Sequence, residues 1–167
     1  LPLYEAVPDT CVELVQINNR INELKQDLVR EKNRLQAPDN KFIKPDIVAH
    51  AEHLNTMIKK LQSRLDVLIG TDQDLQDKLK QLEEIAGIGK TIAINLMLAV
   101  PELGHINNKA VASLTGVAPH PNESGNTVRY RRTIGGRRFI RPMLFIAAMS
   151  ASRSHSPLGE FYRALIA

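Results

Sequence analysis

The chain has 167 residues, of which 43% are hydrophobic, 24% charged and 4% aromatic. This length and composition fit one or two small soluble domains and exclude a low-complexity or collagen-like chain. No run approaches the ~20 apolar residues of a membrane helix, and the first residues lack the basic-then-apolar pattern of a signal peptide, so we expect a cytoplasmic protein. The single cysteine, Cys11, excludes an internal disulfide framework and a cysteine zinc site, and its apolar neighbours predict a buried small side chain.

The net charge of +4 is unevenly distributed along the chain. Residues 1–84 hold 12 Lys and Arg against 15 Asp and Glu, a net charge of −3, whereas residues 85–167 hold 10 against 3, a net charge of +7. Such a concentration of positive charge favours a polyanionic partner, and nucleic acid is the leading candidate. The second part of the chain is therefore the candidate functional region.

Two long helices are predicted in the first part, because apolar residues recur there three and four positions apart. The first helix runs from Asp9 to Gln36, with Glu31 as the one polar residue on its apolar stripe, and the second begins near Pro45, a residue suited to a first helical turn. The two stripes consist of Leu14, Ile17, Ile21, Leu24, Leu28 and Leu35, and of Ile47, Ala51, Leu54, Ile58, Leu61, Leu65 and Leu68.

The second stripe keeps its spacing beyond Gly70, with Asp72 as a polar interruption, so this helix either continues or pauses at the glycine. The two stripes either bury each other within one chain or join two chains in a coiled coil. Stripes with almost no aromatic residues make a thin core, which favours some burial between chains. We therefore expect residues 1–81 to form a long antiparallel coiled-coil hairpin that also makes a homo-oligomer.

Residues 82–167 are predicted to form a small helical domain, so the whole fold is expected to be all-α. Its predicted elements are a tight turn at residues 87–89 followed by a helix, a short helix over 108–115, an ordered loop or short hairpin over 120–136, a helix over 137–153 and a short helix after Pro157. On the helix over 137–153, we expect the buried side to carry Met143, Leu144, Ala147 and Ala148.

The sequence Gly87-Ile88-Gly89 fits the turn of a helix-hairpin-helix motif, in which amides at the next helix N-terminus contact a phosphate without base specificity. Lys90 and Thr91 follow in the first turn of that helix, and Lys90 adds a positive charge. The alternative is an ordinary glycine turn between two packed helices. The spacing before Lys90 does not fit a Walker loop.

Arginines are densest between Ser124 and Arg141, a segment without acidic residues. The six are Arg129, Arg131, Arg132, Arg137, Arg138 and Arg141. A guanidinium donates two parallel hydrogen bonds to phosphate oxygens, so such a cluster can hold a phosphodiester and neutralise charge that develops in a transition state. A solvated basic face is the alternative, but the glycines and the interleaved Tyr130 and Phe139 favour nucleic-acid binding.

Ser124 precedes the arginines in a turn-prone segment. A serine hydroxyl attacks phosphorus only with a base or in a strongly electropositive setting; the arginines can supply the setting, and His120 or Glu123 the base. A loop serine is more commonly a turn former. Tyr130 is an alternative nucleophile, but the Arg-His-Arg spacing of tyrosine recombinases is missing.

No metal site is predicted within the chain. Residues 85–167 contain only Glu102, Glu123 and Glu160 as acidic residues, and these are too scattered to indicate a two-metal carboxylate cluster. His50 and His53 share a helical face, but their heptad context predicts solvated side chains.

The motifs GIG, PELG, GVAP, SG and GGRRFIRPMLFIAAMSA occur in this order after the predicted coiled coil. Together they resemble the C-terminal part of the insertion-sequence one-ten family of transposases, relatives of the Piv pilin-gene invertases, and the resemblance covers nearly the whole chain. It implies a DNA recombinase with a nucleophilic serine and a bridge-type guide RNA. It also implies an N-terminal RuvC-like domain with four acidic residues, which would bring Mg²⁺; no cofactor is expected within this chain.

The family's functional residues can be placed on this sequence one by one. The nucleophilic serine falls on Ser124, the glycine–arginine stretch on Gly135, Gly136, Arg137 and Arg138, and the helix arginine on Arg141. The resemblance therefore changes the preferred role of Ser124 from turn former to nucleophile.

The sequence contains no acidic RuvC-like domain, so we expect a C-terminal fragment that lacks the metal-binding half of a composite active site. The resulting interpretation is a fragment of a DNA transposase or recombinase, associated with the nucleoid when bound to DNA. The alternatives are a non-catalytic nucleic-acid-binding module and a dimerisation fragment with a basic tail.

Overall fold

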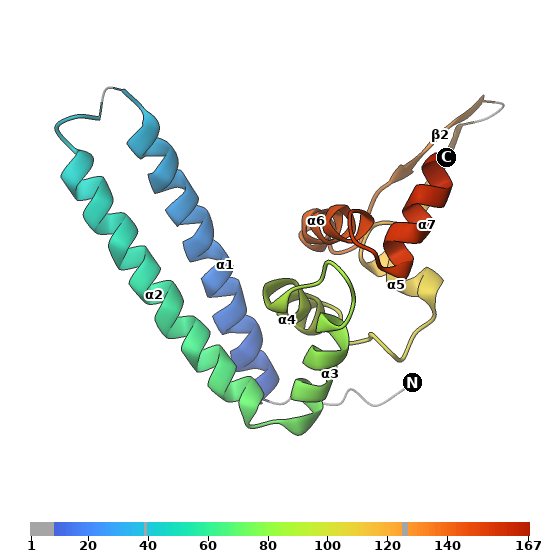
Figure 1. Cartoon of the computed structure of the whole chain (residues 1–167), viewed down its shortest axis with the longest axis horizontal. Helices are drawn as coiled ribbons and strands as arrows, with labels where there is room; N and C mark the ends of the chain where they lie inside the picture. The colour runs from blue at the N-terminus through green and yellow to red at the C-terminus, as the bar shows by residue number, and fades with distance from the viewer. Residues whose placement is uncertain (1–8, 39, 125–126) are drawn as a thin grey trace. The chain divides into compact units, whose positions relative to one another are not determined.

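The computed structural model describes residues 9–38, 40–124 and 127–167, without the side chains of Asp9, residues 122–124, residues 127–129 and Arg131. Over these ranges the fold is all-α apart from one small hairpin of strands, which confirms the predicted class (Figure 1). The helices are α1 (Asp9–Gln36), α2 (Lys44–Gly70), α3 (Gln73–Glu83), α4 (Lys90–Ala99), α5 (Asn108–Leu114), α6 (Ile140–Ser152) and α7 (Pro157–Ile166), and the strands are β1 (Pro119–Ser124) and β2 (Thr127–Thr133).

The chain forms two compact units, Leu1–Gln76 and Asp77–Ala167. The first contains the α1–α2 hairpin, and the second contains most of α3 and all the later elements. Each unit has its own buried apolar residues. The assignment of oligomerisation to residues 1–81 and of transposase function to residues 82–167 stays a prediction.

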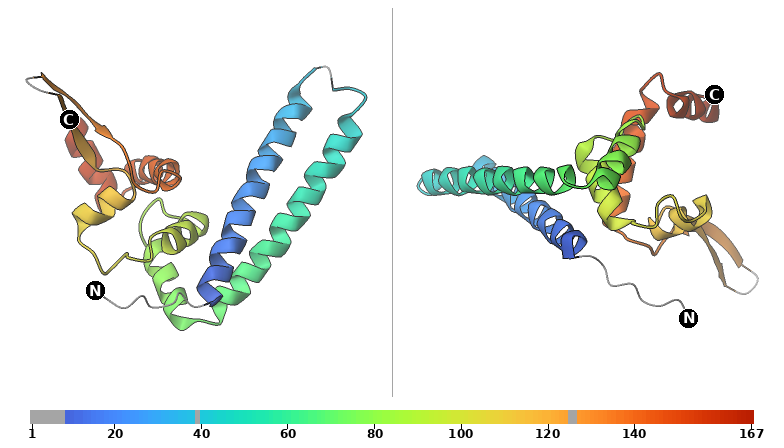
Figure 2. Two further views of the ribbon diagram at one scale, coloured as in Figure 1. Left: turned by 180° about the vertical axis from the view of Figure 1, so that it is seen from behind. Right: turned by 90° about the horizontal axis from the view of Figure 1, so that it is seen from below.

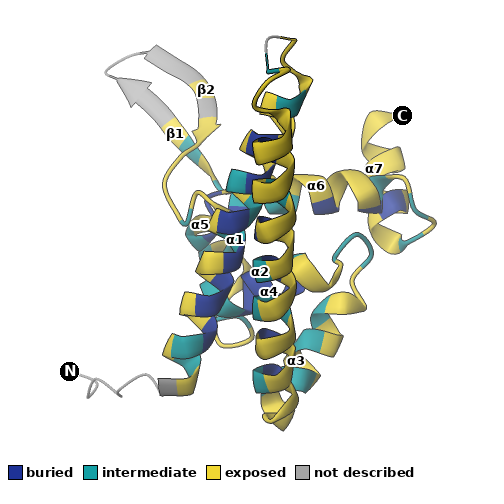
Figure 3. Cartoon of the chain, turned by 90° about the vertical axis from the view of Figure 1, so that its left-hand side faces the viewer, coloured by how far each residue is buried: buried dark blue, intermediate teal, exposed yellow. Residues whose placement is uncertain are grey.

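Helices α1 and α2 run antiparallel and pack along their length (Figure 2). Residues of the predicted stripes make most of this contact. Of these residues, Leu35, Ala51, Leu61 and Leu68 are only half-buried, and Ile69, which was not predicted, is buried. The buried residues recur along both helices (Figure 3). They are Leu14, Ile17, Ile21, Leu24 and Leu28 on α1, and Ile47, Leu54, Ile58, Leu65 and Ile69 on α2. Because the chain buries these stripes by itself, burial within one chain is the alternative that the structure adopts. Homo-oligomerisation through this hairpin stays a prediction.

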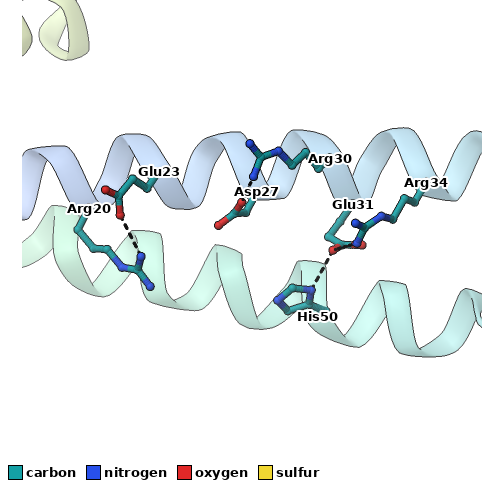
Figure 4. A network of polar contacts seen from close by, with 7 residues as sticks. All are labelled: Arg20, Glu23, Asp27, Arg30, Glu31, Arg34 and His50. Atoms are coloured by element: carbon teal, nitrogen blue, oxygen red, sulfur yellow. Dashed lines mark hydrogen bonds and ion pairs between the residues drawn. The ribbon is translucent and has the colours of Figure 1, made fainter.

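The polar residue on the first stripe, Glu31, is buried and has two partners (Figure 4). Its Oε1 accepts from Arg34 Nη1 at 2.7 Å and lies 3.1 Å from Nδ1 of His50 on α2. A second contact between the helices joins Arg64 to Glu13. A buried carboxylate is costly without partners, so the contact with His50 favours one register of α1 against α2.

The second helix pauses after Gly70, which answers the question that the spacing left open. Asp72, the polar interruption, accepts a hydrogen bond from the Leu75 backbone N–H at 3.1 Å, the usual contact of an N-cap residue. The interruption is therefore the start signal of α3.

In the second unit, Leu96 and Val100 form a buried cluster with Ile140, the first residue of α6. Side chains from α3, from α4, from the turn between them and from the loop after α4 pack against it, among them Leu82, Ile92, Ile88 and Leu103. These contacts connect the start of α6 to α3 and α4. This cluster is the apolar core of the second unit, and it anchors the start of α6, which follows the β1–β2 hairpin.

Strands β1 and β2 pair antiparallel, so of the two predicted possibilities the structure has the hairpin rather than the ordered loop. The following helix begins at Ile140, three residues later than predicted, because Gly135 and Gly136 have positive φ angles and a turn intervenes. On this helix Ala147 is buried as predicted, whereas Met143 and Leu144 are only half-buried, Ala148 is exposed, and Ala151 is buried instead. The backbone of Ala151 lies against Gly87 and Gly159: an added Cβ on Gly87 would lie 3.0 Å from Ala151 N, and one on Gly159 would lie 3.0 Å from Ala151 O. This packing accounts for the burial of Ala151.

Several side chains differ from the predicted burial. Cys11 is half-buried, so its prediction as a fully buried residue is wrong. Helices α6 and α7 expose apolar residues at helical spacing: Phe145, Ile146, Met149, Leu158, Phe161, Tyr162, Leu165 and Ile166. Within the described part of the chain, no helix combines the length and hydropathy needed to cross a membrane.

Candidate nucleic-acid interface

The hairpin places the predicted nucleophile at one end of a short ribbon. Pro119 pairs with Thr133 at the end nearest α5 and α6, and Ser124 pairs with Thr127 at the other end. A strand rises about 3.3 Å per residue, so Ser124 lies about 17 Å along β1 from Pro119. The Ser124 side chain itself is outside the described part of the structure.

The six arginines consequently belong to two separate groups. Arg129, Arg131 and Arg132 lie on β2, opposite β1, and the other three follow the hairpin, at the end far from Ser124. Arg132 is exposed, as is the neighbouring aromatic residue Tyr130 at 90%. The side chains of Arg129 and Arg131 are outside the described part of the chain.

The two candidate bases differ in their distance from Ser124 along β1. His120 pairs with Arg132 and is four residues from Ser124, about 13 Å along the strand, which is too far for a direct hydrogen bond. This separation argues against His120 as the base. Glu123 directly precedes Ser124, and its side chain lies outside the described part.

Three glycines flank the hairpin at its base: Gly116 precedes β1, and Gly135 and Gly136 follow β2. Their backbones lie close together. Gly116, Gly135 and Gly136 have φ angles of +71°, +76° and +64°. A Cβ on Gly136 would overlap the backbone nitrogen of Gly116, and it would lie 2.6 Å from the Ser113 carbonyl oxygen. Only glycine combines these φ angles with this close approach of two backbones.

Arg137 directly follows these glycines and bonds to other residues of the chain through both its side chain and its backbone. Its Nη1 and Nη2 donate to the two carboxylate oxygens of Glu102 at 2.8 and 2.7 Å, and its backbone N–H donates to Leu114 O at 2.6 Å. The hydrogen bonds from Arg137 lower the pKa of Glu102 to about 2, and the carboxylate raises the pKa of Arg137. The sequence-based picture of unpaired arginines therefore does not hold for Arg137.

Arg138 and Arg141 have different environments. Arg138 is exposed, in the turn before α6. Arg141 is half-buried: its Nη2 makes a long contact of 3.4 Å to Gly135 O, and its Nε is buried without a hydrogen-bond partner among the described residues. Arg138 is thus open to a phosphate from solvent, whereas Arg141 lies partly beneath the glycine turn.

The Gly87–Gly89 turn joins α3 to α4, and its two glycines have different surroundings. Gly87 has a φ of +88°, and a Cβ there would overlap the Ala147 carbonyl oxygen of α6. Gly89 is the N-cap of α4 and has open space where a Cβ would be. Gly87 is therefore a packing residue, and the exposed start of α4, with Lys90 and Thr91, is the part of this turn that solvent reaches.

Among the residues that the structure describes, no group of three or more His, Cys, Asp or Glu side chains could hold a metal ion. Glu102, which the sequence offered only as a scattered carboxylate, lies instead in the ion pair with Arg137. Sequence reasoning missed this role. The signal was present in the PELG motif, whose glutamate is the one acidic residue between 85 and 122.

A small helical domain with a net positive charge, exposed arginines and a serine in its basic hairpin has the features of a protein that acts on nucleic acid. The chain belongs to the Transposase IS116/IS110/IS902 family, whose model matches residues 79–163, just over half of the chain. This match confirms the resemblance drawn from the motifs.

Two curated relatives carry the same name, pilin gene-inverting protein. The protein from Moraxella bovis is 26% identical over 159 residues, and the one from Moraxella lacunata is 25% identical over 159 residues. In each case the alignment covers 93% of this chain and 49% of the relative. The chain thus spans about half the length of the curated relatives it matches.

Proposed function

We propose that this chain is the part of a DNA transposase or recombinase that binds DNA and supplies the nucleophile for strand exchange. The observation that carries the proposal is the family match over residues 79–163, because it includes every predicted site residue. The relatives' name describes the inversion of a gene, which is a DNA rearrangement. The same chemistry is proposed here for the complete protein.

DNA binding follows from the charge of the second unit. Arg132 and Arg138 are exposed, and Arg129, Arg131 and Arg141 add positive charge along the same segment. We assign these five to phosphate contacts, which give affinity without sequence specificity. Gly89, Lys90 and Thr91 at the start of α4 offer a second contact of helix-hairpin-helix type, with Gly87 shaping the turn.

The proposed reaction is a transesterification at Ser124. Its Oγ attacks a DNA phosphorus and loses its proton, an Oγ–P bond forms, and the bond to one deoxyribose oxygen breaks; that oxygen leaves and takes up a proton. Attack on the serine–DNA link by a hydroxyl of another strand then releases Ser124. Because each step exchanges one phosphoester bond for another, no nucleotide cofactor is required. The arginines on β2 would stabilise the negative charge that develops at phosphorus.

Two further parts of the proposal come from the family resemblance. One is a guide RNA that pairs with the DNA. The other is Mg²⁺ held by an acidic domain of the complete protein, since the described residues of this chain supply no ligand cluster. Self-association through the α1–α2 hairpin is the remaining predicted partnership.

One observation favours a second candidate, a nucleic-acid-binding module without catalysis. Ser124 is about 17 Å along β1 from the end of the hairpin that adjoins Arg137, Arg138 and Arg141. On this alternative, Ser124 only shapes the end of the hairpin, and the five arginines assigned to phosphate contacts act by binding a backbone.

The two candidates differ in whether a protein–DNA adduct survives denaturation. We expect Ser124→Ala in the complete protein to retain DNA affinity and to lose both the adduct and recombination, whereas Tyr130→Phe stays active. Ser150→Ala, at an exposed serine on α6, is the matched control and keeps both activities. Undiminished adduct in Ser124→Ala contradicts the nucleophile assignment, and DNA binding without an adduct in any variant supports the binding module.

A further inference from the structure

We propose that Glu102 is a positioning residue: it holds Arg137 as an internal counter-ion, and the pair fixes the base of the β1–β2 hairpin. Arg137 is then removed from the set of phosphate ligands to which the sequence assigned it. The inference rests on the proposed function only in taking this hairpin as the DNA-binding element.

The geometry of the pair is that of a planar fork matched to a carboxylate. Two hydrogen bonds of 2.8 and 2.7 Å join residues that are 35 positions apart in sequence. The exposed fractions are only 32% for the Arg137 side chain and 36% for Glu102. A two-bond contact fixes orientation as well as distance, so it restrains the segment around Arg137 against the loop that follows α4.

The backbone of the same segment is restrained independently. Arg137 N–H donates to Leu114 O at the end of α5, and Gly136 packs against Gly116 and Ser113. Three residues after Arg137, Ile140 is completely buried in the core of the second unit. Arg137 is therefore held by its side chain, by its own amide and by both flanking segments.

These restraints act on both strands of the hairpin. β1 begins at Pro119, three residues after Gly116, and β2 ends at Thr133, two residues before Gly135. The glycine contact and the ion pair consequently hold the two ends from which the strands project. A small change of angle at this base is amplified at Ser124, about 17 Å away.

Arg137 and Arg138 differ in whether a carboxylate lies beside the guanidinium. A phosphate that bound Arg137 would have to displace the Glu102 carboxylate or lie beside it, and two anions close together repel each other. Arg138 is exposed, and no carboxylate of the described residues pairs with it. We therefore assign phosphate binding to Arg138 and positioning to Arg137.

Salt titration of binding to mixed-sequence duplex DNA by the 167-residue chain tests this division. A plot of log affinity against log salt has a negative slope, and each lost phosphate contact reduces the magnitude of that slope by about one. We expect this reduction for Arg138→Gln and no change of slope for Arg137→Gln. Glu102→Gln frees Arg137 to bind a phosphate, so it should increase the magnitude of the slope by about one. A loss of one unit in Arg137→Gln, with Glu102→Gln unchanged, overturns the assignment.

Hydrogen exchange of backbone amides tests the positioning role without DNA. Glu102→Gln and Arg137→Gln should each speed exchange about fivefold in β1, β2 and the first turn of α6, with α1 and α2 unchanged. Glu23→Gln, which breaks the exposed Arg20–Glu23 pair on α1, is the control and leaves the hairpin unchanged. Unchanged hairpin exchange in both test variants overturns the proposal.

Rescue in the complete protein links the pair to function. Each single variant, Glu102→Arg or Arg137→Glu, should lower recombination at least tenfold, and the double variant should recover activity because the pair is re-formed with reversed charges. Lack of recovery, in a double variant whose hairpin exchange has returned to normal, contradicts positioning. If the wild-type chain binds no DNA at any salt concentration, the proposed function fails, and the exchange experiment alone decides the role of Glu102.

Discussion

The positions of Glu31 and Glu102 are clear from the sequence, but the sequence does not show which residues these two carboxylates contact. Glu31 interrupts an apolar stripe and contacts Arg34 and His50, and Glu102 belongs to a loop and pairs with Arg137. In both cases the partner that gives the residue its role comes from another helix or segment. Only Glu31 is buried, whereas about a third of each side chain in the Glu102–Arg137 pair meets solvent, so screening weakens the second contact more than the first.

The Glu102–Arg137 pair predicts a pH-dependent contribution to stability. Because the pKa of Glu102 is lowered to about 2 from its ordinary value of 4.5, the contribution is fully present above pH ~4.5 and is lost as the pH falls through about 2. We expect Glu102→Gln to lower the free energy of unfolding at pH 7 by about 1 kcal/mol, reduced from the value that the pKa alone implies because about a third of each side chain meets screening solvent.

Denaturant titrations of wild type and Glu102→Gln between pH 2 and 7 measure this contribution. The difference in unfolding free energy between the two proteins should be constant above pH ~4.5 and shrink toward zero near pH 2. A difference that grows on acidification would contradict the pairing.

The two glycines of the Gly87–Gly89 turn give a matched pair of substitutions. Gly87→Ala should destabilise the protein by about 2 kcal/mol or more, since it adds a side chain at positive φ and against the α6 backbone. Gly89→Ala, in open space at φ −92°, should cost less than about 1 kcal/mol. Thermal unfolding measures both, and equal losses would show that Gly87 has no special packing role.

At the scale of elements, the α1–α2 hairpin shows how a regular pattern becomes structure. Residues spaced by three and four positions form one side of a helix, and two such sides bury each other. Helix α6 shows the reverse. Its predicted start at Arg137 is displaced to Ile140, because the preceding glycines are held against α5 in a conformation that a helix does not use.

The buried stripe of the hairpin predicts large effects of core substitutions in the first unit. Leu24 is 2% exposed, so Leu24→Ala should cost about 3 kcal/mol of unfolding free energy. Val29, 56% exposed on the same helix, is the control, and Val29→Ala should change stability by less than about 0.5 kcal/mol.

Sedimentation of the wild-type chain and of a variant with Leu24 and Leu28 both replaced by Asn tests association through the hairpin. If chains associate through it, the mass of the wild-type chain exceeds that of a monomer and falls in the variant. A wild-type chain that remains monomeric at high concentration contradicts association through this hairpin.

At the scale of the whole molecule, charge separates the two parts of the chain: −3 over residues 1–84 and +7 over residues 85–167. Phosphate contacts should therefore come from the second part. Replacing Arg132 and Arg138 by Gln should lower the slope of log DNA affinity against log salt by about two. The control has the same change of charge in the first unit, Lys59 and Lys60 replaced by Gln, and should leave the slope unchanged. Equal effects of the two variants would contradict a localised interface.

The sequence by itself determined the all-α class, the α1–α2 hairpin, the position of the basic segment and the family, but it left open whether that segment is a loop or a hairpin. These properties depend on local periodicity, on turn residues and on motifs, all of which can be recognised within short windows of sequence. The pause of the second helix was left open, because Gly70 and Asp72 weaken a helical pattern without ending it. The catalytic role of Ser124 and the phosphate contacts stay predictions.

Only the tertiary structure decided which residues face one another. It paired Arg137 with Glu102 across 35 positions, packed Gly87 against α6, and separated Ser124 from the arginines that follow the hairpin. A sequence pattern records spacing along the chain, whereas an ion pair or a backbone contact depends on distance in space. Among the six arginines that look alike in sequence, the four with described side chains therefore differ according to whether a carboxylate, a glycine turn or solvent lies beside the guanidinium.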